Sequence, residues 1–457
     1  MGLPFETGTH LRRPGDEPLI QAAYKDAEPR PESLELVEAL HGGKTASDVY
    51  LLKEVYSPGQ PEWLRVVKVG PRDELRREWE AYDRHVRPFS AKHHQLMRVL
   101  RHSLDTPSGT SARAALVYEQ AGQAVLQQPE TLPRLLDKAL RGDEGLCQRL
   151  ERVLDNLFGV LSRTLHASRK DADWHAGALS TFYPQRLPAD VDLRLESLDR
   201  LDEAHLDSRK AVKPANDPLG CADLRLKMLA IYGATASQWG REVWLNVSGH
   251  PFVARLTNPD ALTVRDGELQ LRGQIERTRI DLLGDLIRKV LPDFQPHQPG
   301  VKLGATVLPN PLVGYHRWLC PERKVPTFTV TGHGDLHAGN VLATNEQALL
   351  FDYGLTGPDQ PLGADAARLE GTLLREAVAA GALEPADVAT LLVALNDTGV
   401  FDEDFSPLLS EISKPLARAV RILAALRRGV RSTYPQQWHE DGRWLADYYR
   451  NPTSSAC

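Results

Sequence analysis

The chain has 457 residues, long enough for two or three domains and a large buried core. Its residues are 42% hydrophobic and 25% charged, as in an ordinary globular protein. The formal net charge of -6 argues against nucleic acid or an anionic membrane as the main partner.

Two features concern the compartment. No apolar run is long enough to span a bilayer, and the first residues lack the apolar core of a signal peptide. The four cysteines are scattered without metal-ligand spacing, which favours reduced thiols over a disulfide framework: Cys147, Cys221, Cys320 and Cys457. The sequence therefore predicts a cytoplasmic protein.

The N-terminal part of the chain is predicted to be rich in strands. Residues 1–31 contain many prolines, glycines and charges and are expected to form an extended or partly disordered lead-in. Strands are expected at 34–40, 48–56 and 63–69. The Gly-rich turn 42–47 separates the first two; it is not a P-loop, because Glu38 occupies the position of the required first glycine.

Lys68 lies in the middle of the third predicted strand, where a buried ammonium is costly unless it has anionic partners. A helix is predicted over 73–86, and it carries the acidic residues Glu74 and Glu78. An edge-strand lysine that reaches solvent is the competing interpretation.

Two further strands are expected within 94–104 and at 114–118, followed by helices at 132–140 and 146–165. Residues 170–326 form a long interruption. Their first half mixes acidic and basic residues, as expected of a solvated helix face or an acidic patch for a cationic substrate. Short strands and turns then predict a small antiparallel sheet or barrel, with strands at 242–247, 251–256, 262–265 and 269–274 and a helix at 277–290.

The most informative stretch begins after a short buried strand at 328–330. It reads Thr331-Gly-His-Gly-Asp335-Leu-His-Ala-Gly-Asn340-Val-Leu342, and Asp352 follows a second strand at 348–351. An Asp that can accept a proton, with an Asn and an Asp that offer hard oxygens, suits Mg²⁺-dependent phosphoryl transfer. Helices are expected at 385–395 and 406–428, and Trp438–Tyr449 as a terminal packed segment.

The stretch from His333 to Leu342 closely resembles the catalytic loop of the aminoglycoside phosphotransferase and choline kinase group. The resemblance covers about residues 34–165 and 327–430. It implies an α+β, bilobal protein-kinase-like fold with a small β-rich domain inserted before the catalytic loop. The expected order is a lead-in (1–31), an N-lobe (32–122), a first part of a helical C-lobe (123–169), the insertion (170–326) and a C-terminal part with the catalytic loop (327–457).

The resemblance also implies a site. Asp335 would orient the acceptor hydroxyl, and Asn340 and Asp352 would hold Mg²⁺. Lys68 would bind the ATP phosphates and pair with an acidic residue of the helix at 73–86, with Glu78 as the first choice and Glu74 as the alternative. Gly42 and Gly43 would cover the phosphates through backbone N–H groups. Residues 116–122 resemble the hinge between lobes, so the backbone of Glu119 and Ala121 would contact adenine, although a plain buried strand fits equally.

Further expectations concern the residues around this loop, the number of metal ions and the function. His333 and His337 are expected to brace the loop by hydrogen bonds, and Asp365 to cap a helix or to support the loop. Gly354 departs from small-molecule kinases, which often have a second carboxylate there, so the number of Mg²⁺ ions stays open. The prediction is an ATP-dependent kinase for a small-molecule or peptide hydroxyl; the alternative is a kinase-like nucleotide- or partner-binding module, with the insertion recruiting a protein partner.

Overall fold

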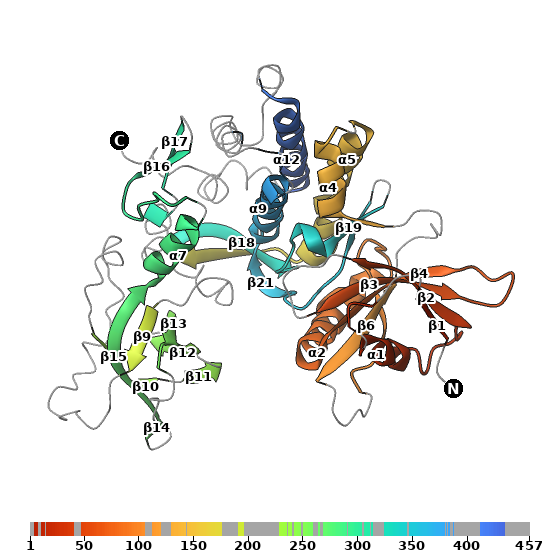
Figure 1. Cartoon of the computed structure of the whole chain (residues 1–457), viewed down its shortest axis with the longest axis horizontal. Coiled ribbons are helices and arrows are strands. Elements are labelled where there is room, and N and C mark those ends of the chain that lie inside the picture. Colours follow the sequence, from red (N-terminus) through yellow and green to blue (C-terminus); the bar gives the residue numbers. More distant parts are fainter. Residues whose placement is uncertain are drawn as a thin grey trace. The chain divides into compact units, whose positions relative to one another are not determined.

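The computed structural model describes residues 4–7, 11–13, 15–40, 47–105, 112–119, 129–142, 144–175, 191–195, 228–234, 236–239, 242–247, 250–258, 264–265, 268–289, 291–303, 306–310, 312–313, 324–344, 347–379, 381, 383, 387 and 412–434. The chain divides into two compact units, each described here by itself (Figure 1). Unit 1 comprises residues 1–172 and 327–446, and unit 2 comprises residues 173–326 and 447–457. Both contain strands and helices, so the fold is α+β.

Unit 1 begins with a six-stranded sheet in the order β1-β2-β3-β4-β6-β5. Its strands are β1 (Phe5–Thr7), β2 (Ser33–Leu40), β3 (Asp48–Val55), β4 (Trp63–Pro71), β5 (Val99–His102) and β6 (Arg113–Glu119). β1 pairs with β2 in parallel and the remaining pairs are antiparallel. The strands predicted at 34–40, 48–56, 63–69 and 114–118 are confirmed, and the one expected within 94–104 is limited to β5.

A different helix packs on each face of the sheet. α1 (Asp16–Ala23) and Tyr24 pack on one face, against Val67, Val69 and Val117. Side chains alternate between the two faces of a strand. Lys68, which lies between Val67 and Val69 in β4, therefore points to the opposite face. There it meets α2 (Arg72–Ala81).

The expectation of an extended or partly disordered lead-in is wrong. Residues 15–31 include α1, whose Ile20 is fully buried under the sheet. The buried carboxylate of Asp16 accepts a hydrogen bond from Tyr50 Oη at 2.7 Å and lies 3.2 Å from Arg113. Eight residues are too few for the helical period to be evident among prolines and glycines, and the partners of Asp16 are distant in sequence.

The helix predicted over 73–86 is present, with a change of winding. α2 ends at Ala81 and a π-helical turn follows at Tyr82–Val86, before the short α3 (Arg87–Ser90). Leu75, Tyr82 and Val86 are buried, as an apolar stripe predicts, and so is Glu78.

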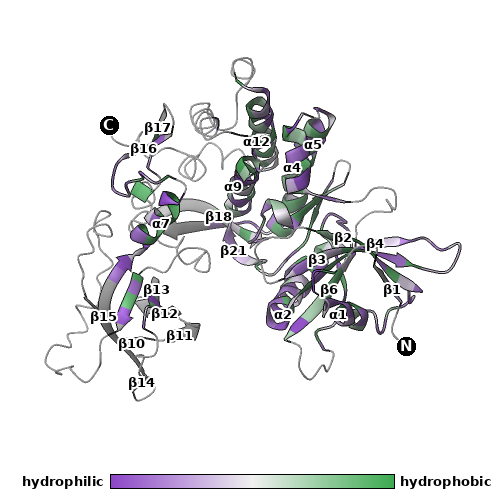
Figure 2. Ribbon diagram, in the orientation of Figure 1, coloured by the Kyte–Doolittle hydropathy of each residue, from purple (hydrophilic) through white to green (hydrophobic). Residues whose placement is uncertain are grey.

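The rest of unit 1 is mainly helical. It contains α4 (Leu132–Leu140), α5 (Glu144–Arg163), α9 (Ala364–Ala379) and α12 (Lys414–Thr433), along which apolar and polar residues alternate (Figure 2). α5 and α12 approach closely at Gly429, where a Cβ would lie 2.9 Å from the backbone oxygens of Leu154 and Asp155. No helix within the described residues is long and apolar enough to cross a bilayer.

The helix predicted over 406–428 has different bounds. α12 begins at Lys414 because the Ser413 hydroxyl accepts a hydrogen bond from the amide of Leu416, which makes Ser413 its N-cap, and it continues to Thr433. Apart from Asp387, which is helical, the segments predicted at 385–395 and Trp438–Tyr449 lie outside the described residues.

Strands flank the loop from His333 to Asn340 that carries the sequence motif. β18 (Lys324–Gly332) leads into it, and the 3₁₀ turn η8 (Ala338–Asn340) ends it. β19 (Val341–Ala343) and β20 (Ala348–Leu350) then form the predicted hairpin, and β19 also pairs with β7 (Glu130–Thr131). β18 lies between β21 (Gly357–Pro361) and β8 (Lys170–His175).

Unit 2 is built on a seven-stranded sheet with the order β10-β15-β9-β13-β12-β11, and β14 pairs with β15. Its strands are β9 (Val191–Leu195), β10 (Met228–Ala234), β11 (Ala236–Trp239), β12 (Glu242–Val247), β13 (His250–Leu256), β14 (Val264–Arg265) and β15 (Glu268–Thr278). α7 (Arg279–Arg288) and the hairpin of β16 (Gly300–Leu303) and β17 (Thr306–Pro309) follow.

The expectation of a purely antiparallel sheet or a barrel in this unit needs correction. β13 pairs with β9 in parallel, and the order of the described strands has two ends, as in an open sheet. Arg255 and Asp192, opposite each other on these two strands, form a two-bond ion pair at 2.7 and 2.8 Å. β9 is short and leads directly into a charged stretch at 196–210, so its place in the middle of the sheet was not evident from local sequence.

Candidate active site

A buried cluster of three charges joins three distant segments of unit 1. Lys68 Nζ lies 2.8 Å from Glu78 Oε2 and 2.7 Å from Asp352 Oδ2. The side chains of Lys68 and Glu78 are 7% and 2% exposed, and that of Asp352 is 17% exposed. The choice of Glu78 over Glu74 agrees with this contact, since Glu78 is buried whereas Glu74, one turn earlier in α2, is exposed. The competing idea of a solvent-reaching Lys68 does not fit its burial.

The pKa values in this cluster follow from burial and mutual charge. Burial raises the pKa of Glu78, and the charge of Asp352 raises it further against the opposing effect of Lys68, to about 7. Burial alone would lower the pKa of Lys68 and raise that of Asp352, but their mutual attraction reverses both shifts. Lys68 and Asp352 are therefore charged at neutral pH, whereas Glu78 is poised between its two forms.

Tyr118 is a member of this cluster that sequence reasoning missed. Its side chain is fully buried, and its hydroxyl donates a hydrogen bond to Glu78 Oε1. It reaches Glu78 from β6, the strand next to β4 in the sheet. Only the pairing of β4 with β6 reveals this proximity, since the two residues are 40 positions apart.

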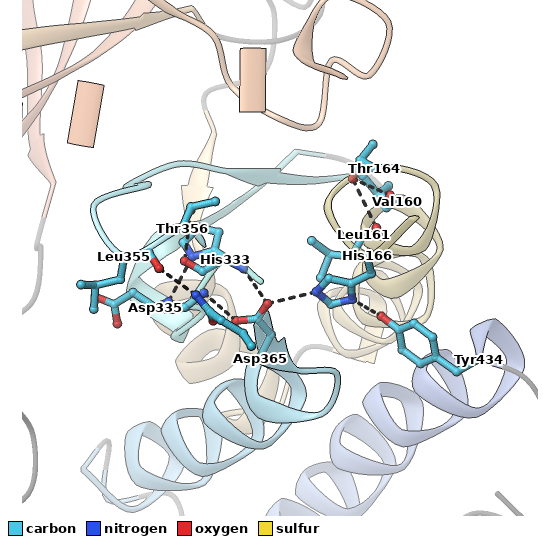
Figure 3. A network of polar contacts seen from close by, with 12 residues as sticks. Val160, Leu161, Thr164, His166, His333, Asp335, Leu355, Thr356, Asp365 and Tyr434 are labelled. Carbon is cyan, nitrogen blue, oxygen red and sulfur yellow. Dashed lines mark hydrogen bonds and ion pairs between the residues drawn. The ribbon is translucent and has the colours of Figure 1, made fainter. Parts of the chain in front are cut away.

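The loop that begins at His333 is fixed at its start by Asp365 (Figure 3). Asp365 Oδ2 accepts a hydrogen bond from the His333 amide at 2.8 Å, and Oδ1 accepts one from the Gly334 amide at 3.0 Å. Asp365 lies within α9 rather than before it, so it is not the N-cap; it supports the loop, which was the other expectation. Burial raises its pKa, but hydrogen bonding and charge from His166 outweigh this and lower it.

Gly334 shows why this turn needs glycine. Its φ is +77°, a conformation that side chains rarely adopt, and a Cβ would lie 2.2 Å from the carbonyl oxygen of Leu355. The Thr356 hydroxyl donates to the His333 carbonyl at 3.1 Å, which ties the same turn to the segment after Asp352.

The two loop histidines act as braces, as predicted. The fully buried His333 accepts a hydrogen bond from the Asp335 amide through Nδ1 at 3.4 Å, and its Nε2 lies 3.1 Å from the Phe351 carbonyl. Burial lowers its pKa, so the ring is neutral and Nε2 is the donor. His337 Nδ1 accepts from the Gly339 amide at 3.0 Å and caps η8.

His166 and Tyr434 support Asp365 from the side away from His333 (Figure 3). His166, which follows α5, has Nε2 3.1 Å from Asp365 Oδ2, and its Nδ1 is hydrogen bonded to the hydroxyl of Tyr434 at the end of α12. Sequence reasoning named neither residue. Their contact depends on the packing of α5 beside α12, which a single sequence does not display.

Asp335 has a partner that was also missed. Its carboxylate Oδ1 forms an ion pair with Arg368 of α9, and its backbone oxygen accepts a hydrogen bond from Asn340 Nδ2 at 2.9 Å. The available signal was spacing: Arg368 lies three residues after Asp365, on the same face of a helix.

Asn340 and Asp352 flank the same end of a hairpin. Val341 pairs with Leu350, and the Phe351 amide donates to the Asn340 carbonyl at 3.3 Å, so Asn340 and Phe351 are opposite and Asp352 comes next. The bond from Asn340 Nδ2 to the loop fixes its amide and leaves the side-chain oxygen as the atom that could bind a metal ion. Asp352, with φ of +65°, is partly exposed. One amide and one carboxylate oxygen fit Mg²⁺, which usually takes few protein ligands and completes its shell with water and phosphate.

Of the four residues predicted to bind the nucleotide through their backbone, the structure describes Glu119. Gly42, Gly43 and Ala121 lie outside the described residues. Glu119 ends β6; its carboxylate pairs with Arg98, and its amide donates to the Arg98 carbonyl at 2.7 Å. Contact with an adenine would therefore need its carbonyl rather than its amide.

Residues 32–457 match the family described as ternary complex associated domain 9, and the chain belongs to that family. No curated protein matches the chain. The match spans both units, so the segment inserted into unit 1 is included in the family's extent.

Proposed function

We propose that this protein is an ATP- and Mg²⁺-dependent phosphotransferase that moves the γ-phosphate to a hydroxyl of a small molecule or peptide. The observation that carries the proposal is the contact of Lys68 with both Glu78 and Asp352. These residues come from a strand, the helix after it, and a turn 274 positions beyond Glu78, and the kinase-like resemblance predicts this set. A protein without a polyanionic ligand has little use for a buried cluster whose carboxylates outnumber its cation.

The proposal extends to the fold of unit 1. In a bilobal protein-kinase-like arrangement, the six-stranded sheet with α2 corresponds to the N-lobe, and α4, α5, α9 and α12 to the helical C-lobe. The loop from His333 to Asn340 and the hairpin β19–β20 then lie in the chain order that the resemblance implies. The support is the order of elements together with the Lys68 cluster.

Each residue has a defined task in this scheme. Lys68 binds phosphate oxygens, and Glu78 keeps its ammonium in place. Asn340 and Asp352 would hold Mg²⁺, which when bound neutralises phosphate charge. Asp335 orients the acceptor hydroxyl and accepts its proton as the bond from the acceptor oxygen to the γ-phosphorus forms, while the bond from this phosphorus to the bridging oxygen breaks and ADP leaves. The protein contributes mainly position and charge, which is what phosphoryl transfer requires.

A second candidate is a kinase-like module that binds nucleotide or a partner without turnover. In this candidate, the Asp335 carboxylate serves only its ion pair with Arg368 and takes no part in chemistry. The family's description refers to a ternary complex, and unit 2 would then recruit a protein partner. The two candidates differ in one property: only the enzyme needs the Asp335 carboxylate for its activity.

The test is transfer of labelled phosphate from ATP to pools of small-molecule and peptide acceptors, with and without Mg²⁺. The wild type should label an acceptor only with Mg²⁺, and Asp335→Ala should lose most of that activity while still binding ATP. Nucleotide binding without transfer to any pool, and without slow hydrolysis, would support the binding module instead.

A further inference from the structure

One face of α9 contacts the loop from His333 to Asn340 at several residues. Asp365 accepts hydrogen bonds from the amides of His333 and Gly334, and Arg368 contacts the side chain of Asp335. Thr372 Oγ1 accepts a hydrogen bond from the Ala338 amide at 3.0 Å. The three α9 residues are spaced at i, i+3 and i+7, which places them on one helix face.

Their tasks differ. Asp365 and Thr372 hold backbone groups, so they set the path of the loop. Arg368 holds a side chain, and that side chain belongs to the residue that orients the acceptor in the proposed function. The ion pair places the positive charge of the guanidinium beside Oδ1, which favours one orientation of the carboxylate.

The surroundings make this contact persistent. The side chains of Arg368 and Asp335 are 20% and 19% exposed, so solvent screens the pair only in part. Arg368 Nε is buried and has no hydrogen-bond partner within the described part of the chain. Within the described residues, the Asp335 carboxylate is the ion-pair partner of this guanidinium.

We propose that Arg368 is the positioning residue for Asp335: it sets the carboxylate orientation in which the acceptor hydroxyl is aligned with the γ-phosphate. The inference rests on the proposed function and adds a residue to it. Arg368 acts through Asp335 and does not touch the reacting atoms.

The experiment compares Mg²⁺-dependent phosphate transfer, or ATP hydrolysis where no acceptor is supplied, by the wild type, Arg368→Met and Arg368→Lys. The matched control is Arg375→Met, which removes an exposed arginine of the same helix that pairs with Glu376. Arg368→Met should lower kcat about 10- to 100-fold, since misplacement of a reacting group by about 1 Å has an effect of this size. The KM for ATP should stay within about twofold, and the control should match the wild type.

Two additional measurements separate positioning from general damage. Ethylguanidinium added to Arg368→Ala should restore part of the lost kcat, which a merely structural role would not predict. Arg368→Met should have little further effect in an Asp335→Asn background, because both changes remove the same function.

The outcomes are distinct. Equal kcat in the wild type and Arg368→Met overturns the role of Arg368 and leaves the proposed function intact. Additive losses in the double variant also overturn it. A wild-type protein that turns over no ATP overturns the proposed function and this role with it.

Discussion

Replacement of Glu78 by glutamine should stabilise the protein at alkaline pH while it impairs the proposed activity. Glu78 is buried, and burial together with the nearby charge of Asp352 raises its pKa to about 7 from an ordinary 4.5. Between these values the folded protein holds a proton on Glu78 that the unfolded chain has released. Stability therefore falls as pH rises through this window. Glutamine, which has the shape of the protonated carboxyl, does not titrate.

The magnitude follows from the separation of the two pKa values. Each pH unit between them corresponds to about 1.4 kcal/mol, so the full effect is about 3 kcal/mol. At pH 5 the free energies of unfolding of the wild type and Glu78→Gln should be similar. At pH 8 the variant should be more stable by up to about 3 kcal/mol, because the buried carboxylate with its desolvation cost is gone.

The assay is urea unfolding at pH 5, 6, 7 and 8, with Glu74→Gln as the control. Glu74 is exposed on the same helix, so its replacement should leave the pH dependence unchanged. A Glu78→Gln protein that is less stable than the wild type at pH 8 would refute the reasoning. It would mean that the attraction of Lys68 exceeds the cost of burying the Glu78 charge.

Three further predictions concern the loop and its support. Gly334→Ala should lower the free energy of unfolding by at least about 2 kcal/mol in thermal or urea unfolding, because φ is +77° and a Cβ would meet the Leu355 carbonyl; an unchanged midpoint contradicts this. Gly429→Ala should lower the free energy of unfolding by about 1–3 kcal/mol, because α12 meets α5 at this residue. The control Gly371→Ala has open space around its Cβ and should raise the free energy of unfolding by about 0.5–1 kcal/mol. Equal effects of the two changes would refute the close approach. Asp365→Asn should cost about 3 kcal/mol at pH 7. Because hydrogen bonds from His166 and the loop hold the pKa of Asp365 below 3.8 against the effect of burial, that stability is lost only as pH falls below 3.8, so the variant should show a weaker acid transition than the wild type.

Local patterns in the sequence predicted the elements around the site well. Runs of strand-forming residues between turn signals predicted β2, β3, β4 and β6, and the helical period predicted α2, α4 and α5. The pairing of Lys68 with Glu78 could be predicted because a lysine on a buried strand needs an anion, and the following helix offers one on its buried face. These predictions depend on residues that are near one another in the chain.

The residues that were missed act across long sequence separations. Arg368, Tyr118 and Tyr434 reach Asp335, Glu78 and His166 only after helices and strands have packed. α1 was missed because it is short, and β9 because it is short and leads into a charged stretch. In each case the stabilising partner lies far away in the sequence, so local composition carries no signal for it.

The central claim is that Lys68, Asp335, Asn340 and Asp352 form a phosphoryl-transfer site, and the most direct test is Mg²⁺-dependent conversion of ATP to ADP by the purified protein. Wild type, Asp335→Asn and Asp352→Asn should be compared at equal concentration. The reference is the same reaction with Mg²⁺ removed by a chelator. The account predicts turnover by the wild type that requires Mg²⁺ and falls at least about 100-fold in each variant. Equal rates in the wild type and Asp335→Asn would contradict it.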